Sequence, residues 1–70
     1  MGAVDHADAH REAAETHDRA AQRHREAAER YEEQGDLELA ALERRNVEIE
    51  LAAAVLERDR AALLAGRREG

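Results

Sequence analysis

The chain has 70 residues, of which 43% are hydrophobic and 40% are charged, and its formal net charge is −6. This length allows one small domain with a limited core, and the acidic balance disfavours general binding to nucleic acids or anionic membranes. The chain lacks cysteine, and it has neither an apolar run near the roughly 20 residues of a membrane span nor a signal segment, so we expect a cytoplasmic protein without disulfides.

Residues from about 5 to 33 are predicted to form the first helix, with Asp5 as its N-cap. A seven-residue pattern repeats through this helix and produces one histidine column and one alanine column. The first column is His10, His17, His24 and Tyr31, and the second is Ala7, Ala14, Ala21 and Ala28. Since seven residues make about two helical turns, both columns lie on one stripe, like positions a and d of a coiled coil.

Residues 34–36 are predicted to form a turn between two helices. Gly35 suits the left-handed residue that closes a helix, and Asp36 suits the N-cap of the next helix. The heptad phase also changes here, because the histidine column leads to no apolar seam when it is continued beyond Tyr31. One continuous helix with a stutter is the alternative. The glycine followed by a good N-cap favours the turn.

Residues 37 to about 65 are predicted to form the second helix, which Gly66 ends before a tail over residues 66–70. If the chain folds back at Gly35, residues whose numbers add to about 70 face each other, and alanine meets leucine or isoleucine in alternate layers. A small residue opposite a large one lets the helices approach closely. The predicted seam is Ala14, His17, Ala21, His24, Ala28, Tyr31, Leu39, Leu42, Asn46, Ile49, Ala53, Leu56 and Leu63.

The predicted fold is all-α, an antiparallel two-helix hairpin that resembles a coiled coil and makes a single domain over residues 1–70. The second helix has more apolar surface than one hairpin covers. The excess lies on a flank that we interpret as an interface, made of Val47, Leu51, Ala54, Val55 and Ala61. A second copy would cover this flank, so we expect a homodimer that forms a four-helix bundle.

The histidines have a structural interpretation and a metal-binding one. Residues seven apart are about 10.5 Å apart along a helix axis, too far for two to hold one ion. Only His6 and His10 could chelate from a single helix, and a dimer could bring two columns together around zinc or nickel. The metal candidates are His6, His10, His17 and His24. We favour no cofactor and half-buried histidines that hydrogen-bond across the seam, with Asn46 opposite His24 fixing the register.

Residues 28–47 contain the order Ala-x-x-Tyr-x-x-x-Gly-Asp-Leu-x-x-Ala, which resembles the turn of a tetratricopeptide repeat. The resemblance implies a helix–turn–helix whose packing residues are Tyr31, Gly35, Leu37 and Ala40. It covers under a third of the chain, and the helices here are about twice the length usual in that repeat, so it does not imply a concave peptide-binding groove. The whole chain also looks like short helical-hairpin proteins of high-GC bacteria, a likeness that implies no function.

Three functional hypotheses follow from these patterns. The first is a non-catalytic structural or protein-interaction module that acts through self-association. The second is a small helical protein that binds a metal or haem through the histidine column. The third is an adaptor that completes its bundle with another protein. We do not expect an enzyme, because a hairpin of alanine and leucine layers offers no pocket for a substrate.

Overall fold

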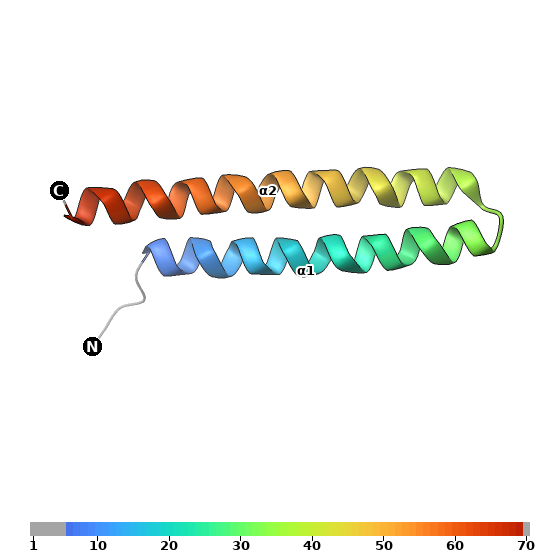
Figure 1. The fold of residues 1–70 in the computed structure, drawn as a ribbon, viewed down its shortest axis with the longest axis horizontal. Coiled ribbons are helices and arrows are strands. Elements are labelled where there is room, and N and C mark those ends of the chain that lie inside the picture. Colours follow the sequence, from blue (N-terminus) through green and yellow to red (C-terminus); the bar gives the residue numbers. More distant parts are fainter. Residues whose placement is uncertain (1–5, 70) are drawn as a thin grey trace.

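In the computed structural model, the described residues 6–69 form an antiparallel pair of α-helices. Helix α1 is His6–Glu33 and helix α2 is Leu37–Glu69. The helices lie side by side, with the turn at one end of the molecule and with the start of α1 and the last part of α2 at the other (Figure 1). Residues 6–69 contain no strand, so the predicted all-α hairpin is confirmed.

The molecule is a narrow rod with a single contact surface between its two helices. Its radius of gyration is 16.1 Å and its extents are 53 × 21 × 9 Å. A compact domain of this length would have a radius of gyration of about 11 Å. Since each helix has one neighbour, only one stripe of each helix is covered, and the opposite faces meet solvent.

The turn predicted around Gly35 is confirmed in its details. Gly35 has a φ of 80°, in the left-handed region that glycine adopts without strain. The backbone N–H of Asp36 donates to the carbonyl of Tyr31 at 2.9 Å, and that of Gly35 donates to Glu32 at 3.0 Å, the two bonds of a Schellman motif. Oδ1 of Asp36 then accepts from the N–H of Leu39 at 3.1 Å and caps α2.

The end of α2 differs from its prediction, because the helix continues through Gly66 to Glu69. The prediction that Gly66 ends the helix is therefore wrong, as is the predicted tail from residue 66 to residue 69. A glycine inside a helix costs only about 1 kcal/mol relative to alanine, and the arginines that follow are good helix formers. The last part of α2 extends past the start of α1 (Figure 1). The predicted N-cap Asp5 lies outside the described residues.

The buried seam consists almost entirely of alanine. Its members are Ala7, Ala14, Ala21 and Ala28 in α1, and Ala40, Val47, Ala54 and Ala61 in α2, each 9% exposed or less. Alanine facing alanine lets two helix backbones come close together. The predicted seam positions Ala14, Ala21 and Ala28 are thus confirmed. We call this set of eight residues the alanine seam.

The large aliphatic residues predicted for the seam lie outside it, so this part of the prediction is wrong. The exposed fractions are 50% for Leu42, 65% for Ile49, 49% for Leu56, 56% for Leu63 and 39% for Leu39. Turning α2 to bury them would separate the two alanine columns. It would also break every hydrogen bond that joins the side chains of the two helices.

The flank predicted as an interface divides between the seam and the surface. Val47, Ala54 and Ala61 are buried in the alanine seam and cannot contact a second molecule, which corrects that part of the prediction. Leu51 and Val55 are 37% and 57% exposed. Helical position explains the division, because Val47, Ala54 and Ala61 are seven apart on one face, whereas Val55 follows Ala54 by one position, a rotation of about 100°.

Three other predicted seam residues, Tyr31, Asn46 and Ala53, are half-buried. The tetratricopeptide resemblance implied that Leu37 and Ala40 pack in the hairpin. Ala40 is buried, but Leu37 is 69% exposed and does not pack between the helices.

Candidate functional site

Hydrogen bonds join the histidines of α1 to glutamates of α2 along one edge of the alanine seam. The Nδ1–oxygen distances are 2.9 Å for His10 to Glu57, 2.6 Å for His17 to Glu50 and 2.6 Å for His24 to Glu43. An ionised carboxylate can only accept, so Nδ1–H of each imidazole is the donor. We call these six residues the histidine ladder.

The ladder forms because both helices carry the same seven-residue spacing beside the alanine seam. The residue numbers in each ladder pair add to 67, which fixes the register of the hairpin. The histidine side chains are 31–37% exposed, and the glutamate side chains are 12–24% exposed. The prediction of half-buried histidines that hydrogen-bond across the helices is therefore confirmed.

The predicted partners of the histidines were wrong. The rule that facing residue numbers add to about 70 places Asn46 opposite His24, Ala53 opposite His17 and Arg60 opposite His10. The true partners were missed, although Glu43, Glu50 and Glu57 are seven apart and so match the histidine spacing. That shared spacing was the signal that could have identified them. The sequence prediction instead placed the large aliphatic residues of the second helix on its inner face, which turns these glutamates away from the histidines.

Glu57 is the most enclosed member of the ladder. It is 9% exposed and is the only buried charged residue in the described part of the chain. It accepts from His10 and also from Arg60, which lies one turn further along α2. These hydrogen bonds lower the pKa of Glu57 below its ordinary value, and the one from His10 has the larger effect. Partial burial of the carboxylate opposes this change.

The other edge of the alanine seam carries arginine–carboxylate pairs. Nη2 and Nε of Arg44 donate to the two carboxylate oxygens of Glu32 at 2.7 Å and 3.2 Å, and Arg58 donates to Asp18. These hydrogen bonds raise the pKa of Arg44 and that of Arg58. Polar side chains thus join the two helices along both edges of the seam. These contacts fix the rotation of α2 about its own axis.

The described residues are not arranged around a metal ion. Within residues 6–69, no group of three or more histidine, cysteine or acidic side chains is arranged to hold an ion. The ladder histidines use Nδ1 for glutamate, and Nε2 of His24 is 4.0 Å from a second carboxylate, that of Glu50. The candidate His6 is exposed at the start of α1. The structure therefore brings His10, His17 and His24 to carboxylates and not to one another.

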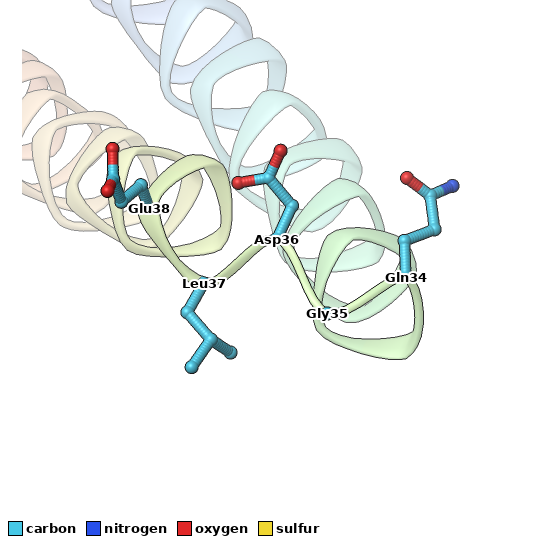
Figure 2. A pocket seen from close by; sticks show the side chains of 5 residues that line it. All are labelled: Gln34, Gly35, Asp36, Leu37 and Glu38. Atoms are coloured by element: carbon cyan, nitrogen blue, oxygen red, sulfur yellow. The ribbon is translucent and has the colours of Figure 1, made fainter.

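A shallow depression of about 420 Å³ lies at the turn (Figure 2). It is lined by Gln34, Gly35, Asp36, Leu37 and Glu38. Leu37 points away from the side on which the carboxylates of Asp36 and Glu38 lie (Figure 2). The depression is open to solvent and its polar groups do not converge, so it lacks the features of a ligand pocket.

A column of large aliphatic side chains runs along the outer face of α2. Its members are Leu42, Ile49, Leu56 and Leu63, which we call the leucine column. Each member follows a seam residue by two positions, which is a rotation of about 200° around the helix and nearly opposite the seam. Helix α2 is therefore apolar on two opposite faces, of which the hairpin covers only one.

None of the helices within residues 6–69 combines the length and the apolar character needed to span a membrane. Comparison of the chain with protein-family models, with curated proteins and with solved structures gives no match. The features of the hairpin that bear on its function are therefore the alanine seam, the histidine ladder and the leucine column.

Proposed function

We propose that this protein is a non-catalytic helical module that binds a second copy of itself through the leucine column. It would act as a structural or protein-interaction element. The supporting observation is that the four members of the column are 49–65% exposed in the single hairpin. Natural monomers rarely leave a long continuous row of large aliphatic side chains in water.

The free energy available from covering the column is comparable with the cost of forming a dimer. Fully burying a leucine or isoleucine side chain contributes about 1.5–3 kcal/mol, so four half-exposed side chains would contribute about 3–6 kcal/mol per chain. A symmetric dimer doubles this to about 6–12 kcal/mol, against an association cost of about 4–15 kcal/mol. Burial of the residues that flank the column would make the free energy of association more favourable.

The weak core of the hairpin gives a second reason for association. The alanine seam buries seven alanine methyl groups and one valine side chain, or about ten carbons. At about 0.8 kcal/mol per carbon this is on the order of 8 kcal/mol, an upper estimate for the apolar contribution. Binding to the folded hairpin alone would stabilise it further by mass action.

The proposed dimer contains four helices, as the sequence suggested, but its contact surface is different. Three of the five residues first assigned to the interface fill the alanine seam. The leucine column takes their place, and the exposed Leu39 extends it toward the turn.

Substitution of Ile49, the most exposed member of the column, tests this proposal. Ile49→Glu places a charge in the proposed contact and should convert the dimer to monomer in light-scattering measurements of molar mass. Ala9→Glu is the matched control, because Ala9 is an exposed apolar residue of α1. A monomeric unmodified chain would contradict self-association and favour an adaptor that receives a helix from another protein. An Ile49→Glu dimer would exclude the leucine column as the contact.

A further inference from the structure

We infer that two copies pair their α2 helices in antiparallel directions, about a two-fold axis that passes between Ala52 and Ala53. This inference rests on the proposed self-association and specifies its geometry. In this arrangement Leu42 lies opposite Leu63 of the partner subunit, and Ile49 lies opposite Leu56 of the partner subunit. An evenly spaced column matches itself in either direction, so the flanking residues must determine the orientation.

Two rows of residues flank the leucine column on the surface of α2. One row is Arg45, Ala52, Asp59 and Gly66, and the other is Leu39, Asn46, Ala53 and Arg60. In an antiparallel pair with this axis, each row faces its own counterpart. Arg45 then lies beside Asp59 of the partner subunit, and symmetry produces this contact twice.

Arg45 and Asp59 are available for such a contact. Both are exposed, and neither side chain makes a hydrogen bond or an ion pair within residues 6–69. The neighbouring arginines differ, because Arg44, Arg58 and Arg60 all bind carboxylates of the same chain. The hairpin thus satisfies the charges beside its own seam and leaves an opposite pair beside the leucine column.

The smallest flanking residues lie at the centre of the proposed contact. Ala52 and Ala53 would each meet the same residue of the other copy at the two-fold axis, where two crossing helices are closest. The larger Arg45 and Asp59 lie a further seven positions along the helix on either side. The antiparallel contact therefore has small residues at its centre and the two charged residues on either side.

In a parallel pair of α2 helices, Arg45 and Asp59 would not contact each other. The two flanking rows would then face each other, so Arg45 would lie beside Leu39 and Asn46 of the partner subunit, without an acidic neighbour. Asp59 would lie beside Arg60 of the partner subunit, but Arg60 already donates to Glu57 in its own chain. The antiparallel arrangement is therefore the one that pairs both free charges.

The position of the leucine column also sets the order of the four helices. Because the column lies nearly opposite the alanine seam, the two α2 helices would be central and the two α1 helices would be outermost. The histidine ladder would then stay at the side of the assembly, with the partial solvent exposure that it has in the single hairpin. A square four-helix bundle would instead enclose both ladders and carry the desolvation cost of their charges.

Charge reversal and mixing of variants test the antiparallel contact. Arg45→Asp places two aspartates together at both contacts of its homodimer, and Asp59→Arg places two arginines together. For each variant alone, the dissociation constant of the dimer should be about tenfold higher than that of the unmodified chain. Sedimentation velocity at low salt measures this constant. An equimolar mixture should recover the affinity of the unmodified chain, because the mixed dimer contains two Asp–Arg contacts. The double variant should recover it as well.

The controls and outcomes separate this inference from the proposed function. Arg30→Asp and Glu26→Arg make the same charge changes at exposed positions of α1 and should leave the dissociation constant unchanged. If Ile49→Glu dissociates the dimer but the mixture binds no better than its components, self-association stands and the antiparallel contact is overturned. If the unmodified chain is a monomer, both proposals are overturned.

Discussion

At the scale of single residues, Glu57 makes the stability of the hairpin depend on pH. Its carboxylate accepts hydrogen bonds from His10 and Arg60, and these lower its pKa in the folded protein below the ordinary value of 4.5. The unfolded chain therefore takes up this proton more readily as the pH falls. The stabilisation is fully present above about pH 4.5 and is lost as the pH falls through the lower folded-state pKa.

We predict that Glu57→Gln destabilises the hairpin at pH 5 and that its effect shrinks as the pH falls below 4.5. The measurement is the free energy of urea unfolding of the variant and the unmodified chain, at one protein concentration and at several pH values. Glu48→Gln is the control, because the Glu48 side chain is exposed and makes no hydrogen bond or ion pair within the described residues. A Glu57→Gln effect that is the same at pH 5 and pH 2.5 would contradict this linkage.

The part of the ladder that was predictable from the sequence is the part carried by α1. The spacing of His10, His17 and His24 beside alanine placed them at the edge of a seam, where imidazoles are half-buried. Their partners depend on the rotation of α2, which a residue in α1 does not determine. The seven-residue glutamate spacing is the sequence signal for this pairing, and the rotation of α2 decides whether the glutamates or another column of α2 face the histidines.

At the scale of elements, two glycines have opposite roles. Gly35 needs a positive φ to close α1, whereas Gly66 lies inside α2 with helical neighbours on both sides. A Cβ atom added at either residue would meet no atom within 4 Å, so backbone conformation alone separates them.

We therefore predict opposite effects for the same substitution at these two positions. Gly35→Ala should reduce the free energy of unfolding by about 1 kcal/mol, because alanine resists the left-handed region. Gly66→Ala should increase it by about 0.5 kcal/mol, because alanine is the better helix former. Urea unfolding followed by circular dichroism measures both. Stabilisation by Gly35→Ala would mean that the chain is helical through residue 35 and that the turn is wrong.

The rotation of α2 was the element-scale feature that the sequence prediction missed. Helix α2 has apolar residues on two opposite faces, and periodicity identifies both without ranking them. The larger residues were assigned to the inner face, as in a leucine-rich coiled coil. The alanine column of α1 instead selects small partners such as Ala54, because close backbone approach and polar bonds on both edges outweigh the burial of larger side chains.

At the scale of the whole molecule, the hairpin separates its two apolar surfaces. The alanine seam holds the two helices together, and the leucine column lies on the outer face, where only another molecule can cover it. The hairpin therefore has one apolar surface, the leucine column, that no other part of the described chain covers. Length and composition predicted that a single hairpin would be incomplete, because a chain of 70 residues rich in alanine builds only a small core.

Sedimentation equilibrium of the unmodified chain tests the central claim most directly. The chain has a mass of 7.8 kDa, so a dimer should sediment with twice that mass at micromolar concentrations. We predict this doubled mass, with dissociation to the single-chain mass on dilution. A single-chain mass at all concentrations up to about 1 mM, where even weak self-association is detected, would contradict the account.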